Sequence, residues 1–185
     1  MNALQVNRRI KALALPPNPT VGDLARVRAE SAELMAMREG HVPLDPIPVL
    51  EWPADLGGGV RFQGYASRWT PATDGSCRQR GDFAGSIPQY LAAGGPLTLG
   101  HDERYPLGRV MSVWEEEEGL AVDAIVFPAR NDDHQTIIDG LTHGLIRALS
   151  WSGFSPDPRA VVLDEICLTD YPGHPDAIVT AVQPL

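Results

Sequence analysis

The stretch LIRALSWSGFSPDPRAVVLDEICLT, residues 145–169, contains two short runs that favour extended structure. Apolar residues dominate both runs, 145–154 and 161–169, and β-branched residues are frequent in the second. Two prolines and an aspartate separate the runs. The stretch therefore predicts two strands with a turn between them.

Similar runs recur through the C-terminal two-thirds of the chain, each bounded by Gly, Pro or Asp: 60–67, 106–115, 119–127 and 177–182. Two stretches with helical spacing, 82–93 and 133–143, interrupt them. We expect an α+β fold: a mostly antiparallel sheet, closed into a barrel or folded on itself, with a few helices.

The first 58 residues have a different character. Prolines 16, 17 and 19 interrupt regular structure, the apolar spacing over 21–39 predicts an amphipathic helix, and four prolines lie within 41–58. We expect residues 1–58 to form an arm, a helix and a Pro-rich linker, and residues 59–185 to form the compact domain.

Composition narrows the functional classes. The formal charge of −9 on 185 residues disfavours binding to nucleic acid, because no basic stripe is present to displace phosphate counterions. The two cysteines, Cys77 and Cys167, are 90 residues apart and indicate neither a zinc site nor a disulfide framework. No apolar run approaches the length of a membrane span, so we expect a soluble, intracellular protein.

Four consecutive glutamates, Glu115 to Glu118, stand before Gly119 between two of the strand-like runs. Charges gathered at the tip of a hairpin are typical of a solvated turn. We expect no function for them.

Three residue types with the chemistry of a serine hydrolase occur on separate strand-like segments. His101 follows an apolar run, and Ser150 and Ser152 share one side of their strand by the period of two. Glu165 interrupts an apolar strand, where a carboxylate needs a partner, and an imidazolium would serve.

Each of these residues also has an ordinary interpretation. A single histidine is often structural, serines in strands commonly form local hydrogen bonds, and Glu165 would reach solvent on an edge strand. Together they satisfy the needs of a serine nucleophile, which requires an adjacent base and an acidic group that orients the base. Sequence spacing alone does not show that they meet.

Six segments, taken in order, resemble the landmarks of the caudovirus prohead serine protease family: FQGYASRW (62–69), GDFAGSI (81–87), LTLGHDERYPLGRV (97–110), GLAVDAIV (119–126), GLIRALSWSGF (144–154) and LDEICLTDYPGHPDAIVTAV (163–182). The resemblance covers roughly residues 60–182. It implies a fold like that of herpesvirus assemblin, a β-barrel wrapped by helices.

The same resemblance implies roles for the three residues. His101 matches the general base, Ser150 the nucleophile and Glu165 an acidic residue that serves as the third triad member, a place taken by a second histidine in the herpesvirus relatives. It implies a tailed-phage maturation protease that cleaves the scaffold protein, the major capsid protein and itself inside the prohead, in the host cytoplasm. A homodimer is a possible form, and no metal, cofactor, nucleic acid or membrane is implied.

Two departures from the family pattern bear on the site. The family usually has Ser-x-Gly-Phe, whereas Ser150-Trp151-Ser152-Gly153-Phe154 is one residue longer, so a bulge is needed and Ser152 competes with Ser150. Cys167 replaces a common serine, and we expect it to pack in the core.

The sequence leaves alternatives for the oxyanion hole and for the function. Backbone N–H groups of 151–153, with Arg159, are candidates for an oxyanion hole. The alternative function is a catalytically inactive protein of the protease fold that binds capsid or scaffold. An unrelated esterase-like hydrolase is less favoured, because no Gly-x-Ser-x-Gly elbow is present.

Overall fold

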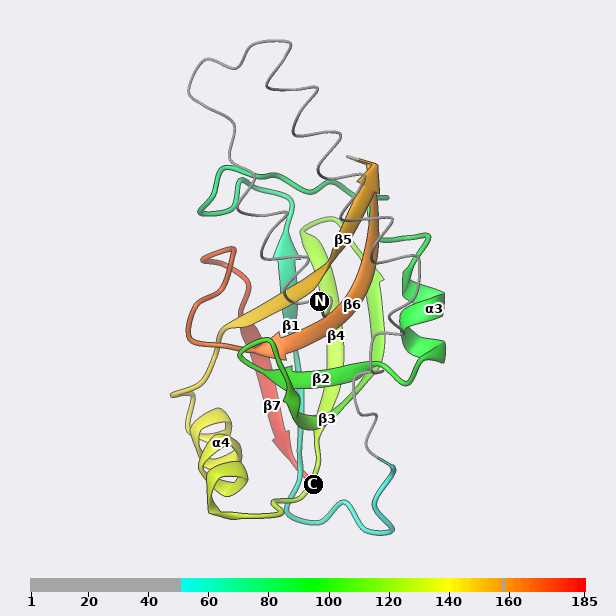
Figure 1. Cartoon of the computed structure of the whole chain (residues 1–185). Coiled ribbons are helices and arrows are strands. Elements are labelled where there is room, and N and C mark those ends of the chain that lie inside the picture. Colours follow the sequence, from blue (N-terminus) through cyan, green and yellow to red (C-terminus); the bar gives the residue numbers. More distant parts are fainter. Residues whose placement is uncertain (1–50, 158) are drawn as a thin grey trace. The chain divides into compact units, whose positions relative to one another are not determined.

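The computed structural model describes residues 51–157 and 159–185, which form a curved sheet with two helices (Figure 1). The elements are β1 (Val60–Arg68), α3 (Ile87–Ala92), β2 (Pro96–Leu99), β3 (Asp102–Glu115), β4 (Gly119–Val126), α4 (Asp132–Thr142), β5 (Leu149–Asp157), β6 (Ala160–Leu168) and β7 (Val179–Pro184). The predicted helix over 21–39, the arm and most of the linker lie outside the described residues. No helix in the described ranges is long and apolar enough to span a membrane.

The seven strands form one mixed sheet in the order β5-β6-β2-β3-β4-β1-β7. Antiparallel pairs dominate, as predicted, but β2 pairs with β6 in parallel through Leu97–Ile166, Thr98–Cys167 and Leu99–Leu168. This short parallel pair joins the β5–β6 hairpin to the rest of the sheet.

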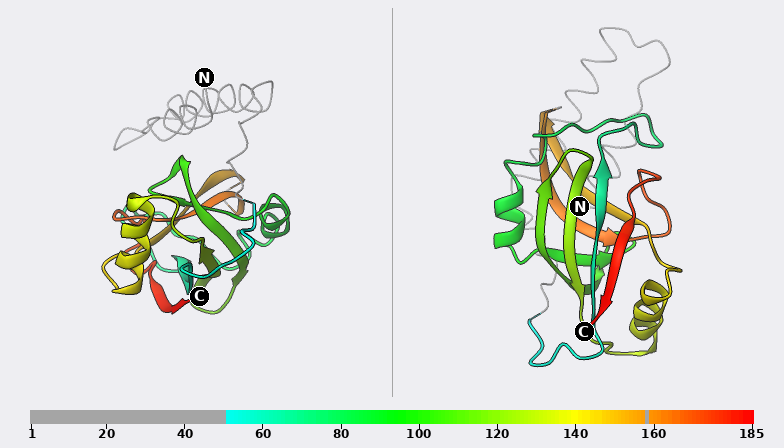
Figure 2. Two further views of the ribbon diagram at one scale, coloured as in Figure 1. Left: turned by 90° about the horizontal axis from the view of Figure 1, so that it is seen from below. Right: turned by 180° about the vertical axis from the view of Figure 1, so that it is seen from behind.

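The expectation of a closed barrel was wrong. Within the described residues, no ladder joins the edge strands β5 and β7; a single bridge, Ala148–Ile178, links the segments that precede them. The Tyr65 N–H also donates to the Ile178 carbonyl at 3.0 Å, so the curved sheet brings β1 close to this bridge. Figure 2 shows the curvature from two further sides.

The first helix is shorter than the sequence predicted, whereas the second agrees with the prediction to within one residue at each end. Stretch 82–93 yields a helix only over Ile87–Ala92, because residues before Ser86 form turns and a proline occupies the first helical turn. Helix α4 begins at the Asn131 cap, whose side chain accepts from the His134 N–H at 2.9 Å. Figures 1 and 2 show the two helices on opposite sides of the sheet.

The core is built from apolar side chains of both halves of the chain. Its fully buried large side chains are Phe62, Phe83, Leu97, Leu120, Leu141, Leu149, Ile166, Leu168, Val60, Val122 and Val126. Phe83, from the predicted Gly-Asp-Phe turn, packs edge to face on Trp151 with ring centroids 4.9 Å apart. This contact supports β5 directly beside Ser150.

The glutamate run is more than a solvated turn. The turn itself is present, with the Glu116 N–H donating to the Gly119 carbonyl at 3.0 Å. However, Glu115 accepts from the N–H groups of Gly81 and Phe83, both at 2.9 Å. Glu116 accepts from the Tyr65 hydroxyl, so these carboxylates tie the 81–83 turn and β1 to the β3–β4 hairpin.

Gly64 provides a test of the approach between β1 and the 178–179 segment. A Cβ at this position would lie 2.4 Å from the Ile178 carbonyl oxygen and 2.8 Å from the Val179 Cα, both backbone atoms. We expect Gly64→Ala to lower the free energy of unfolding by about 2–4 kcal/mol, measured by urea denaturation.

Gly85→Ala is the matched control, since a Cβ there meets nothing within 4 Å. It should change stability by less than about 0.5 kcal/mol. Equal stability of the two variants would show that β1 does not approach the 178–179 segment closely.

Candidate active site

His101 lies in the two-residue turn between β2 and β3. Leu99 pairs with Asp102, and the intervening residues Gly100 and His101 have φ values of 60° and 62°. Two successive left-handed residues define the tight hairpin turn that matches the twist of the strands. Glycine adopts this backbone freely, whereas histidine does so at some cost in strain.

The turn is tied to the end of β6 as well as to its own strands. The Gly100 N–H donates to the Leu168 carbonyl at 2.8 Å. His101 therefore stands above the surface where β2, β6 and β5 run side by side. Its side chain is 32% exposed, which leaves one side of the ring open to solvent.

Ser150 and Glu165 reach this surface from β5 and β6. In the antiparallel register Ser150 is opposite Cys167 and Ser152 is opposite Glu165. Directly opposed side chains project from the same face of a sheet, so all four lie on one face. The predicted common side of Ser150 and Ser152 is confirmed.

The three predicted residues meet in a line of hydrogen-bonding groups. His101 Nε2 is 3.1 Å from Ser150 Oγ, and His101 Nδ1 is 2.6 Å from Glu165 Oε1. A proton on Nδ1 donates to the carboxylate, which leaves Nε2 free to accept from the serine hydroxyl. This is the order in which a nucleophile, its base and an acidic orienting group are arranged in a serine hydrolase.

Glu165 is buried, and its side chain is only 3% exposed. Burial alone would raise its pKa, but hydrogen bonds from His101 and Thr98, the charge of His101 and a hydrogen bond from Ser152 lower the pKa below its usual value. The carboxylate is therefore ionised at neutral pH. The sequence-based expectation that Glu165 needs a partner is met by His101.

Ser150 and Ser152 lie differently with respect to His101. Ser150 Oγ is within hydrogen-bond distance of the imidazole, whereas Ser152 lies opposite Glu165 in the ladder. The ladder shifts register between Ser152 and Gly153, which accommodates the extra residue of this segment as a bulge.

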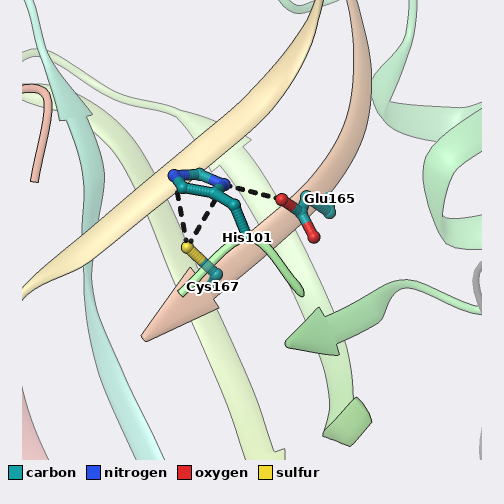
Figure 3. Close-up of side chains that lie close together, drawn as sticks. All are labelled: His101, Glu165 and Cys167. Atoms are coloured by element: carbon teal, nitrogen blue, oxygen red, sulfur yellow. Dashed lines mark hydrogen bonds and ion pairs between the residues drawn. The ribbon is translucent and has the colours of Figure 1, made fainter. Parts of the chain in front are cut away.

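Cys167 packs against His101, as Figure 3 shows, with its sulfur 3.5 Å from both ring nitrogens. The thiol is fully buried, and burial followed by the charge of Glu165 raises its pKa to about 12. A neutral thiol at this position supports the imidazole through packing and polarisable contact.

His101, Glu165 and Cys167 also place three potential metal-ligating atoms within 4.8 Å of one another. The 2.6 Å between His101 Nδ1 and Glu165 Oε1 is a hydrogen-bond distance. Two ligands of a tetrahedral Zn²⁺ would be about 3.3 Å apart, given bonds near 2.0 Å. The distance between His101 Nδ1 and Glu165 Oε1 therefore fits a hydrogen bond and is too short for two ligands of one Zn²⁺ ion.

Arg159 is not brought to the nucleophile. It pairs with Asp82 at 3.7 Å and lies in the turn just before β6, eight positions before Cys167. That separation corresponds to about 25 Å along an extended strand. The structure thus does not place Arg159 in an oxyanion hole beside Ser150.

Sequence reasoning missed Thr98, which is fully buried and donates to Glu165 Oε2 at 2.7 Å. Its position in an apolar segment indicated only a core residue. Its polar side chain in a buried strand was the available signal, since a buried hydroxyl requires a partner.

Comparisons with known proteins give structural similarity only. No protein-family model matches the chain, and no curated protein sequence matches it. The chain is similar to the varicella-zoster virus protease, with a TM-score of 0.45, 14% identity, and coverage of 68% of this chain and 64% of that protein.

Two structures of the KSHV protease are similar to the same extent. One, in complex with a hexapeptide phosphonate inhibitor, has a TM-score of 0.43 at 14% identity and coverage of 68% of this chain and 65% of that one. The other has a TM-score of 0.42 at 15% identity, with coverage of 68% and 61%. The chain spans less than two thirds of each of these proteins, so its function has to be argued from its own site.

The state of the two cysteines can be checked directly. At pH 8 we expect native protein to react with iodoacetamide once, at exposed Cys77, because Cys167 is buried and its pKa is about 12. Intact mass counts the adducts, and the unfolded chain should carry two. Two rapid adducts on native protein would contradict this arrangement of Cys167.

The ionised state of Glu165 predicts a pH-dependent effect of Glu165→Gln. The folded pKa is lowered, so the stability due to the carboxylate is fully present above its unfolded pKa of about 4.3 and is lost as pH falls through the folded value. At pH 7 we expect the variant to be less stable by about 1–3 kcal/mol, because it loses a charge-assisted hydrogen bond.

This difference should shrink below about pH 4, where wild type also becomes protonated. Denaturant unfolding of both proteins between pH 7 and pH 3 measures it. A difference that stays constant with pH would indicate that Glu165 is already neutral in the native protein.

Proposed function

We propose that the chain is a serine endopeptidase with Ser150 as nucleophile, His101 as general base and Glu165 as the acidic member of the triad. The observation that carries the proposal is the line of contacts from Ser150 Oγ through His101 to Glu165, at 3.1 Å and 2.6 Å. A buried, ionised acid, a partly exposed imidazole and a serine on a rigid strand are what acyl transfer requires.

The reaction follows from this geometry. His101 Nε2 takes the Ser150 proton as Oγ attacks the scissile carbonyl, and the imidazolium then donates that proton to the departing amine. Water attacks the resulting ester, again with His101 as base, and releases the second product and free Ser150. Glu165 stabilises the imidazolium throughout without accepting the proton.

The backbone of β5 supplies a donor for the oxyanion. The Thr169 N–H donates to the Ala148 carbonyl at 3.1 Å, which fixes the alternation of hydrogen bonds along β5 and β6. By this alternation the N–H groups of Leu149 and Trp151 point away from β6. The Leu149 N–H donates to Ala177 at 2.8 Å, and no described strand pairs with β5 at Trp151. The Trp151 N–H thus faces the open edge beside Ser150, where an oxyanion would form.

The substrate class rests on sequence resemblance. Six segments over roughly 60–182 resemble the caudovirus prohead serine proteases in order, and we propose cleavage of scaffold protein, major capsid protein and the chain itself during assembly of a tailed-phage capsid in the host cytoplasm. Homodimerisation in the prohead is part of this proposal. A catalytically inactive binding protein of the same fold is the competing function, favoured by the altered Ser150–Phe154 strand.

Co-expression with the neighbouring capsid-protein gene tests the proposal, with the intact mass of the capsid protein as readout. We expect wild type to shorten the capsid protein, and Ser150→Ala or His101→Ala to reduce cleavage by at least about a thousandfold. Ser152→Ala is the matched control and should retain cleavage, since it leaves the Ser150–His101 contact in place.

Other outcomes discriminate between the alternatives. Loss of cleavage with Ser152→Ala but not with Ser150→Ala would move the nucleophile to Ser152. Absence of both cleavage and labelling of wild type by a serine-directed fluorophosphonate would favour the binding protein.

A further inference from the structure

The second oxygen of the Glu165 carboxylate has its own donor. Oε1 faces His101, whereas Oε2 accepts from the Thr98 hydroxyl at 2.7 Å. Thr98 is 0% exposed and Glu165 is 2% exposed, so water does not substitute for this contact. An ionised carboxylate only accepts hydrogen bonds, which fixes the direction of the Thr98 hydroxyl.

The parallel pairing of β2 with β6 places Thr98 in this position. Thr98 is in register with Cys167, and the pair lies beside Glu165, two residues earlier on the same face of β6. Threonine is β-branched, so its χ1 angle is restricted and its hydroxyl direction is well defined. The donor is therefore held by the sheet itself.

The other titratable groups that face Glu165 do not supply a charge to it. Cys167, on β6, is a neutral thiol because burial raises its pKa to about 12. Tyr90, on α3, has a pKa raised by burial and then by Glu165, and its hydroxyl donates to the Pro96 carbonyl at 2.9 Å. His101 is the charged partner of Oε1 during the reaction, so the hydrogen bond to Oε2 has to come from a neutral hydroxyl group.

We propose that Thr98 is a positioning residue of the triad: its hydroxyl holds Glu165 ionised and oriented so that the carboxylate presents Oε1 to His101 Nδ1. The inference rests on the proposed serine protease function and adds a fourth residue to it. Thr98 touches neither substrate nor the reacting atoms.

The proposal predicts a change in chemistry as well as in packing. Without the Thr98 hydroxyl, buried Oε2 loses the donor at 2.7 Å, and the carboxylate binds a proton more readily. The Glu165 pKa then rises, and the active form with ionised Glu165 is lost at higher pH. A residue that only fills space would leave that pH dependence unchanged.

The experiment compares full-length wild type, Thr98→Val and Thr98→Ser in the rate at which a fluorophosphonate probe labels Ser150. We expect Thr98→Val, which keeps the shape but removes the donor, to lower the maximal labelling rate constant about tenfold with little change in probe affinity. The pKa of the Glu165 carboxyl, followed by ¹³C NMR of its side chain, should be higher than in wild type. Thr98→Ser, which keeps the donor, should restore both.

Thr169→Val is the matched control, because it removes another buried hydroxyl from the same end of the sheet without touching Glu165. Its Glu165 carboxyl should titrate as in wild type. If Thr98→Val does not fold, Thr98→Cys replaces it, and its weaker donor should raise the Glu165 pKa in the same direction.

The outcomes separate the two proposals. If wild type is not labelled at Ser150, the protease function fails, and this inference fails with it. If wild type is labelled and a folded Thr98→Val or Thr98→Cys variant keeps the wild-type labelling rate and Glu165 pKa, Thr98 has no positioning role and the protease proposal stands.

Discussion

The parallel pairing of β2 with β6 brings together the segments that carry His101, Thr98 and Glu165. Three residue pairs join β2 near position 98 to β6 near position 167, and among the described residues no other ladder connects the β5–β6 hairpin to the rest of the sheet. The Gly100–His101 turn follows β2 directly, and Glu165 and Cys167 lie on β6. This short ladder therefore holds both the strained Gly100–His101 turn and the strand that carries the buried carboxylate of Glu165.

Burial of an ionised carboxylate is the main energetic demand of this arrangement. An isolated charge in the core would cost several kcal/mol or become neutral, and only several well-placed donors offset that cost. The imidazole of His101, from the β2–β3 turn, and the hydroxyl of Thr98, from β2, bind the two oxygens of Glu165 on β6. The hydrogen bonds that offset the burial of Glu165 are therefore the same ones that orient its carboxylate toward His101.

Much of the sheet was predictable from the sequence because short apolar runs bounded by Gly, Pro and Asp carry a strong local signal. The common face of Ser150 and Ser152 followed from the period of two, and the need of Glu165 for a partner followed from the apolar residues around it. The bulge after Ser152 was also anticipated from one extra residue.

Other features depend on pairings that local patterns do not encode. Whether the sheet closes into a barrel depends on whether its edge strands, β5 and β7, pair with each other, and no local pattern predicts that pairing. Thr98 looked like an ordinary member of an apolar segment because its partner is 67 residues away. The glutamates at 115 and 116 looked solvated because their partners, on the 81–83 turn and β1, were unknown.

The two-residue turn that carries His101 has a consequence for how such a site is controlled. A connection this short has no spare residue with which to change length, and both of its residues already occupy an uncommon backbone region. The imidazole is consequently delivered by a rigid corner, not by a mobile loop. For the proposed protease, this makes access of the polypeptide to the edge of β5, and not movement of the imidazole, the step at which activity would be timed.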